Sequence, residues 1–164
     1  MSFDPELFAL AEKVVAANRA AGRRIATAES CTGGLVAAAL TEVAGASDVF
    51  DRAFITYSNE AKSELLGVSE DILSTLGAVS EATAWSMAQG ALLRSNADIS
   101  VAISGIAGPG GGTEKKPVGT VVFARALKDK TNGPIIADTH HFGDLGRSEI
   151  RRQAALVALR LLLP

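Results

Sequence analysis

The sequence has little of two features that would point to particular partners or compartments. It contains one cysteine, Cys31, so no disulfide can form within the chain. A single thiol suits a reducing compartment, and we expect a cytoplasmic protein. Charge of one sign is also lacking, because 16 basic and 18 acidic residues leave a net charge of −2. Proteins that bind nucleic acid or anionic membranes through bulk charge carry a basic excess, so neither partner is expected.

Long apolar runs are absent as well. No stretch reaches the roughly 18 apolar residues that a membrane-spanning helix needs. The first residues, MSFDPELFALAEKVV, have no basic start and are interrupted by acidic side chains, so they do not read as an export signal. The segment AALVALRLLL, 154–163, carries Arg160 and predicts a buried helix or a surface for another subunit. The 164 residues, 48% of them hydrophobic, fit a single domain over 1–164.

Hydrophobic periodicity and turn residues divide the chain into alternating elements. Helices are expected at 4–21, 33–44, 59–66, 70–76, 80–96 and 147–163. Strands are expected at 24–28, 53–57, 98–105, 117–127 and 135–142. Helices separate the first three strands, and a turn at 131–134 joins the last two as an antiparallel hairpin. This order predicts an α/β fold, a three-layer α/β/α sandwich with a mixed, partly parallel sheet.

The candidate chemistry lies where the first three strands end, since ligands of open α/β sheets bind beyond the carboxyl ends of strands. Ser30 follows the first strand, and Thr32, Gly33 and Gly34 stand at the start of the next helix. If Ser30 is a nucleophile, free N–H groups and the helix dipole there could stabilise an oxyanion. The alternative is that Ser30 or Thr32 only caps the helix.

A serine nucleophile needs a base. The only histidines, His140 and His141, are adjacent in a predicted strand, so at most one could face a given site. Lys62, in ITYSNEAK, is the other candidate. It falls in the first turn of the helix that follows Tyr57, where the dipole disfavours a positive charge and would help to lower its pKa. The alternative is a solvated lysine paired with a neighbouring glutamate.

The glycine-rich loop SGIAGPGGGTEKKPVG, 104–119, matches neither a P-loop nor a Rossmann pattern. Its glycines could offer backbone N–H groups to an anion, or form a flexible connection. Arg147 and Arg151, one turn apart on the last helix, could face one phosphate together or form an exposed basic face. The sequence has no metal-binding motif, so a site without metal is expected.

Several motifs together resemble the CinA C-terminal domain family, the nicotinamide-nucleotide amidases. They are TAESCTGG, ITYSNEAK, GAVSEATA, AISGIAGP and IRRQAA, and they follow the family's order from about Phe8 to Leu163. The resemblance implies an α/β/α sandwich without cofactor, in a bacterial cytoplasmic enzyme that is often a dimer or larger. It further implies that the substrate is a small nucleotide. Nicotinamide mononucleotide would be hydrolysed to nicotinic acid mononucleotide and ammonia in pyridine nucleotide salvage.

By the same resemblance, Ser30 is the nucleophile, and Tyr57 and Lys62 complete the catalytic set. Thr32 and Gly33 would supply the oxyanion N–H groups. The remaining implied residues would bind the substrate: Asn59, Gly105, Ala107, Gly108 and Arg147. Two alternatives stay open, a cysteine amidase that uses Cys31 and a non-catalytic nucleotide-binding or interaction module.

Overall fold

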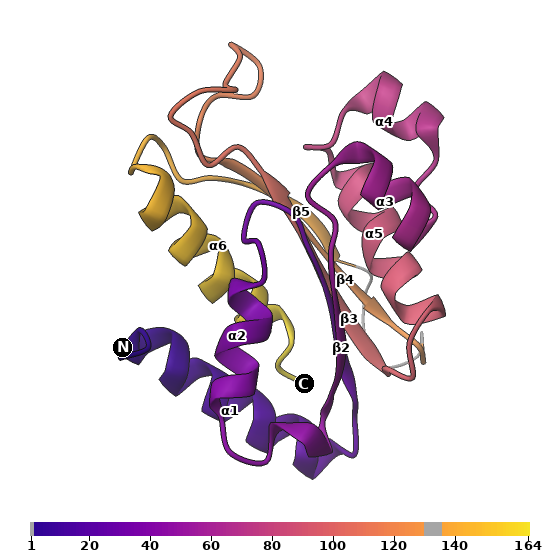
Figure 1. Cartoon of the computed structure of the whole chain (residues 1–164), viewed down its shortest axis with the longest axis vertical. Coiled ribbons are helices and arrows are strands. Elements are labelled where there is room, and N and C mark those ends of the chain that lie inside the picture. Colours follow the sequence, from indigo (N-terminus) through magenta and orange to yellow (C-terminus); the bar gives the residue numbers. More distant parts are fainter. Residues whose placement is uncertain (1, 130–135) are drawn as a thin grey trace.

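The computed structural model describes residues 2–129 and 136–164. Within these residues five strands form one central sheet (Figure 1). The strands are β1 (Ile25–Glu29), β2 (Phe50–Ile55), β3 (Ile99–Gly105), β4 (Thr120–Leu127) and β5 (Ile136–His141). Their order is β2-β1-β3-β4-β5, with β1 parallel to β2 and β3, and with the pairs β3–β4 and β4–β5 antiparallel. The predicted mixed sheet is confirmed, and the predicted turn at 131–134 lies outside the described residues.

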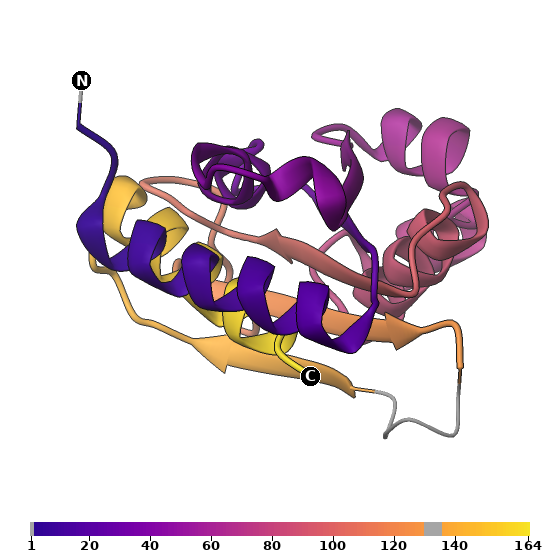
Figure 2. The same cartoon turned by 90° about the horizontal axis from the view of Figure 1, so that it is seen from below.

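Helices cover both faces of the sheet, as the predicted three layers require (Figures 1 and 2). On one face lie α1 (Pro5–Ala21), α2 (Leu35–Glu42) and α6 (Arg147–Leu161). On the other lie α3 (Asn59–Leu66), α4 (Glu70–Leu76) and α5 (Glu81–Leu93). A short 3-10 turn, η1 (Ala46–Asp48), leads into β2.

The two faces of the sheet differ in the size of their side chains. Toward α1, α2 and α6 the sheet presents large apolar residues such as Ile99, Val101 and Ile103 of β3. Toward α5 it presents small ones, Ala26 and Ala28 among them. This alternation follows from the period of two along a strand. The small face lets α5 lie close against the sheet.

Two strands begin three residues away from the predicted start, whereas β1 and β3 begin one residue later than predicted. The second spans 50–55 rather than 53–57. The paired charges of Asp51 and Arg52 interrupt the apolar pattern, so the sequence did not reveal the first residues of this strand. Tyr57 therefore lies outside the strand, in the link to α3. The fourth strand begins at Thr120 rather than Pro117, since the Thr120 N–H donates to the Pro117 carbonyl (3.0 Å) and closes a turn there.

Two helices, α2 and α5, are each four residues shorter than predicted, and α1 and α6 are shorter by one and two residues. The α2 helix begins at Leu35, not at residue 33, because Gly33 and Gly34 adopt φ angles of 59° and 99° that turn the chain before the helix starts. The α5 helix is capped by Ser80 as expected but ends at Leu93 instead of residue 96.

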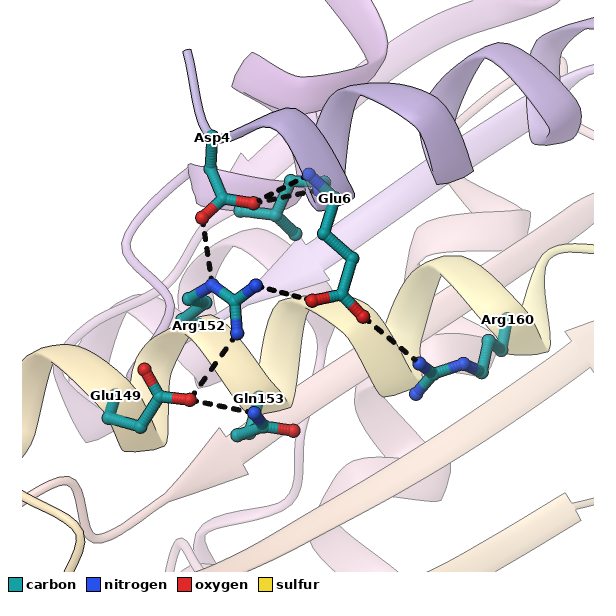
Figure 3. Close-up of polar contacts among 7 residues, drawn as sticks. Asp4, Glu6, Glu149, Arg152, Gln153 and Arg160 are labelled. Atoms are coloured by element: carbon teal, nitrogen blue, oxygen red, sulfur yellow. Dashed lines mark hydrogen bonds and ion pairs between the residues drawn. The ribbon is translucent and has the colours of Figure 1, made fainter.

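An ionic network joins α1 to α6 (Figure 3). Arg152 of α6 donates through Nε to Asp4 (2.8 Å), and its other nitrogens contact Glu6 and Glu149. Asp4 also caps α1, accepting from the N–H of Leu7 (2.9 Å). The Arg152 bond, followed by that N–H, holds the pKa of Asp4 below its ordinary value. The network is partly exposed, so its main effect is to fix where the start of α6 lies relative to α1.

Gly90 sets the distance between α5 and α3. A Cβ atom at this position would lie 2.1 Å from the Leu66 carbonyl oxygen and 2.9 Å from its carbonyl carbon. Both atoms belong to the backbone and cannot rotate away. Only glycine therefore lets the end of α3 approach α5 this closely.

The first prediction concerns this contact. Alanine favours a helix over glycine by about 1 kcal/mol, yet we expect Gly90→Ala to lower the free energy of unfolding by about 1–3 kcal/mol through overpacking. Urea unfolding followed by circular dichroism would measure it. Ser86→Ala, which adds no atoms to the same helix, is the control. A Gly90→Ala variant as stable as the wild type would show that α3 moves away at no cost.

Candidate active site

Ser30 lies at the carboxyl edge of the sheet, directly after β1. Its N–H donates to the Ile103 carbonyl (2.9 Å), which extends the β1–β3 ladder by one residue. Glu29 and Ser30 are neighbours in an extended chain, so their side chains point to opposite faces. Glu29 contacts α2, and Ser30 faces α3. The nucleophile predicted from the sequence thus lies on a rigid strand end.

Lys62 reaches Ser30 from the start of α3. Ser58 caps this helix, its Oγ accepting from the Ala61 N–H (3.0 Å), and this places Lys62 on the helix's second turn, facing the sheet. The Lys62 Nζ lies 3.0 Å from the Ser30 Oγ and 2.8 Å from the Thr56 carbonyl oxygen. The side chain is 1% exposed, so the alternative of a solvated lysine is wrong.

The surroundings of Lys62 favour its neutral form. Lys62 takes part in none of the ion pairs among the described residues. Apart from the Ser30 hydroxyl, its nitrogen contacts only backbone carbonyls in that part of the chain. Burial lowers the pKa of Lys62, and the nearby Cys31 opposes this only in part. A neutral amine can accept the Ser30 proton while its own hydrogens donate to the Thr56 carbonyl.

A buried carboxylate fills the N-terminus of α2. The Glu29 side chain is wholly buried and accepts from the N–H groups of Val36 and Ala37, each at 3.0 Å. The Thr32 hydroxyl also donates to it, at 2.8 Å. These bonds satisfy the amides that a helix leaves free at its start, and the carboxylate neutralises the dipole there.

The predicted oxyanion hole needs a correction at Gly33. Its N–H donates to the Ser30 carbonyl (3.0 Å) and is not free for a substrate oxygen. The N–H of Leu35 is likewise taken, by the Thr32 carbonyl (3.1 Å). Of the two predicted donors, only the Thr32 N–H has no protein acceptor among the described residues, and Thr32 is 0% exposed.

A pocket of about 190 Å³ opens beside Ser30. Seven of the predicted residues line it: Ser30, Tyr57, Asn59, Lys62, Gly105, Ala107 and Arg147. Cys31, Ala78, Val79 and Ser104 line it as well. Thr32, Gly33 and Gly108 do not belong to its lining within the part of the chain that the structure describes.

Sequence reasoning missed three of these wall residues. Ser104 is the last residue but one of β3, and its strand-end position was the available signal. Ala78 and Val79 follow α4, which does not end at a parallel strand, so the strand-end rule could not find them. Their signal was the motif GAVSEATA.

Arg147 joins two walls of the pocket. Its Nη1 donates to the Gly108 carbonyl (2.7 Å) and its Nη2 to the Tyr57 hydroxyl (2.8 Å). Gly108 thereby supports the site from outside the lining. A guanidinium has five N–H donors, so these bonds leave capacity for an anion. The Tyr57 side chain itself is 61% exposed at the mouth of the pocket.

Arg151 does not share the pocket with Arg147 in the described structure. Its Nε donates to the Cys31 carbonyl (3.0 Å) and its Nη2 to the Thr32 carbonyl (3.1 Å). The idea that both arginines face one phosphate is therefore wrong.

The histidines lie far from this chemistry. Both belong to β5, at the edge of the sheet opposite β2. The His140 ring packs edge-on against Phe123, with centroids 5.0 Å apart, and His141 lies 3.4 Å from the Thr120 hydroxyl. Among the described residues no cluster of His, Cys, Asp or Glu could hold a metal ion, and no helix is long and apolar enough to cross a membrane.

Known proteins share both the sequence and the architecture. The chain is 51% identical over 160 residues to nicotinamide-nucleotide amidohydrolase PncC of Escherichia coli K12, covering 97% of this chain and 94% of that protein. It is 53% identical over 142 residues to the CinA-like protein of Mycobacterium leprae, covering 87% of this chain but 32% of that protein. The crystal structure of competence/damage inducible protein CihA from Agrobacterium tumefaciens superposes with a TM-score of 0.94 at 48% identity, covering 99% and 97% of the two chains.

The sequence pattern of the family covers nearly all of the chain. Residues 7–164 match the CinA C-terminal domain. The motifs identified above and the relatives agree with this match. The chain therefore belongs to the CinA C-terminal domain family.

Proposed function

We propose that the protein is a nicotinamide-nucleotide amidohydrolase that releases ammonia from nicotinamide mononucleotide. One observation carries the chemistry: the Lys62 amine lies 3.0 Å from the Ser30 hydroxyl, buried and without a carboxylate partner among the described residues. That pair forms an activated nucleophile without histidine. The E. coli relative bearing this activity in its name supports the choice of substrate.

The reaction begins with transfer of the Ser30 proton to the neutral Lys62 amine. The Ser30 Oγ attacks the carboxamide carbon, and the carbonyl oxygen becomes an oxyanion. The Lys62 ammonium then returns the proton to the departing nitrogen, which leaves as ammonia. Water, deprotonated by Lys62, cleaves the ester that remains on Ser30. The carboxylic acid leaves, and both side chains recover their starting states.

The charge of the substrate fits a neutral lysine. The pyridine ring of nicotinamide mononucleotide is a cation, and a charged Lys62 in the same pocket would repel it. The pocket of about 190 Å³ suits the ring and its carboxamide, with Asn59 and Ala107 in its walls. Ribose and phosphate would then extend to the mouth, where Arg147 offers its remaining N–H groups.

Tyr57, which the resemblance places in the catalytic set, takes a supporting role in this proposal. In the described residues its hydroxyl contacts Arg147, and only its backbone carbonyl approaches the Lys62 amine, at 3.4 Å. In this proposal the Tyr57 hydroxyl orients Arg147, and the ring forms part of the pocket wall that contacts the substrate. The place in pyridine nucleotide salvage, the cytoplasmic location and the homo-oligomer stay predictions.

Ammonia release from nicotinamide mononucleotide is the direct test. We expect release by the wild type and a loss of about 10³-fold or more for Ser30→Ala, because the covalent route is removed. Circular dichroism would show that the variant folds, and binding of the nucleotide would be followed by calorimetry. Binding without ammonia release by the wild type would instead favour the non-catalytic module.

The pH dependence tests the protonation state of Lys62. Only the neutral amine accepts a proton, so kcat/KM should rise with pH and level off above the lysine's pKa. Because burial lowers that pKa, the plateau should begin below the ordinary lysine range. Lys62→Met should lose about 10²–10⁴-fold in kcat. A rate that falls as pH rises through this range would contradict the assignment.

Cys31 should be dispensable as a nucleophile. Burial raises the pKa of its thiol to about 11, so it is almost wholly protonated at neutral pH. We expect Cys31→Ala to keep kcat within about threefold of the wild type, since a protonated thiol contributes no attack. We also expect iodoacetamide to modify the native protein slowly. Loss of activity in Cys31→Ala with activity kept in Ser30→Ala would transfer the nucleophile to Cys31.

A further inference from the structure

One side chain, that of Arg151, binds two backbone carbonyls of the turn that follows Ser30. Arg151 of α6 donates from Nε to the Cys31 carbonyl (3.0 Å) and from Nη2 to the Thr32 carbonyl (3.1 Å). A guanidinium is planar and rigid, so its two bonds fix the two carbonyls relative to each other. Cys31 lines the pocket and Arg151 does not in the described structure, so Arg151 stands on the far side of the turn.

Fixing a carbonyl also fixes an amide. A trans peptide is planar, and its N–H points opposite to its C=O. The Cys31 carbonyl is drawn toward Arg151, so the N–H of Thr32 in the same peptide points away from Arg151. The next N–H, that of Gly33, closes the turn onto the Ser30 carbonyl (3.0 Å).

Several other amides of this segment are already used. Leu35 donates to the Thr32 carbonyl, and Val36 and Ala37 donate to Glu29. Among the described residues the N–H groups of Cys31, Thr32 and Gly34 have no protein acceptor, and of these three residues only Cys31 lines the pocket. An N–H held in this way, close after a nucleophile, is what an oxyanion hole requires.

We propose that Arg151 is a positioning residue for the amidase reaction, fixing the turn whose free N–H groups include those of Cys31 and Thr32 and holding Ser30 against Lys62. Its positive charge adds to the effect, because bonding to a carbonyl strengthens the opposite N–H as a donor. The role rests on the proposed function, since it concerns the same nucleophile. It acts through backbone geometry, without contact to the substrate.

The test compares two adjacent arginines of α6. Arg151→Gln removes the charge and the rigid fork, whereas Arg152→Gln removes the network to Asp4, Glu6 and Glu149. We expect Arg151→Gln to lower kcat by about tenfold to a hundredfold, as for a misplaced oxyanion donor, with KM within about threefold because Arg151 lies outside the pocket. Arg152→Gln should lower stability but keep kcat within about threefold, because the pair is partly exposed and the buried residues of α6 still hold the helix against the sheet.

A second readout keeps this inference separate from the choice of substrate. A fluorophosphonate probe reacts with an activated serine: the Ser30 Oγ–phosphorus bond forms, fluoride leaves and the hydroxyl proton passes to Lys62. Arg151→Gln should slow this labelling in parallel with kcat. If the wild type releases no ammonia from nicotinamide mononucleotide, the proposed function is wrong, and labelling of Ser30 still tests Arg151.

Three outcomes would overturn the proposal. Arg151→Gln could match the wild type in kcat and labelling, or lose no more than Arg152→Gln. Its activity loss could also come with a shifted pH midpoint, which would place its effect on the Lys62 pKa. If Arg151→Gln does not fold, Arg151→Lys replaces it, keeping the charge without the fork. A folded Arg151→Lys protein should show the same loss in kcat at unchanged KM, and wild-type kcat would contradict the role.

Discussion

A lysine amine buried against a serine hydroxyl is the constraint on which this site depends. Lys62 is 1% exposed, and its nitrogen contacts Ser30 and backbone carbonyls. A charged ammonium there would lose its hydration without gaining an ion pair among the described residues, which is costly. The fold therefore stabilises the form that can accept a proton. Burial lowers the pKa of Lys62, and a lysine with a lowered pKa is better able to act as a base near neutral pH.

The rest of the architecture serves to keep that contact short. The position of Ser30 is fixed because its N–H donates to β3. Glu29, the residue before it, accepts from the first turn of α2 and so fixes the turn that follows Ser30. The position of Lys62 is fixed as well, because α3 is capped by Ser58 at its start and packs against Gly90 of α5 at its end. Ser30 is thus fixed by the sheet itself, and Lys62 by the helices packed on one face of it. Precision in the site comes from rigid elements rather than from the loops around it.

Much of this arrangement follows from the sequence, for identifiable reasons. The alternation of strands and helices gives the layers, and the strand-end rule brings Ser30 together with the start of α3. A lysine soon after a serine cap is a local feature, so Lys62 could be placed from its neighbours alone. Tyr57 was harder, because charged residues hid the start of β2 in the sequence, and the strand begins three residues and ends two residues earlier than predicted.

What the sequence could not supply was the use of individual amides and side chains. Glu29 reads as an ordinary polar residue at a strand end, and only its burial against α2 reveals that it occupies the helix mouth. The Gly33 N–H looked free because the turn bond to Ser30 depends on left-handed backbone angles. Arg151 binds a turn 119 to 120 residues away in the chain, and no local pattern encodes such a contact.

The last helix gains its importance from these distant contacts. Arg147 links the Tyr57 hydroxyl to the glycine-rich loop, and Arg151, one turn later, holds the backbone after Ser30. Arg152 points to α1 and fixes where the helix starts (Figure 3). Because one rigid helix carries all three, the mouth of the pocket and its nucleophile share a single frame. A shift of α6 would therefore move the proposed phosphate contact of Arg147 and the turn after Ser30 together, so the proposed binding and chemistry depend on the same packing.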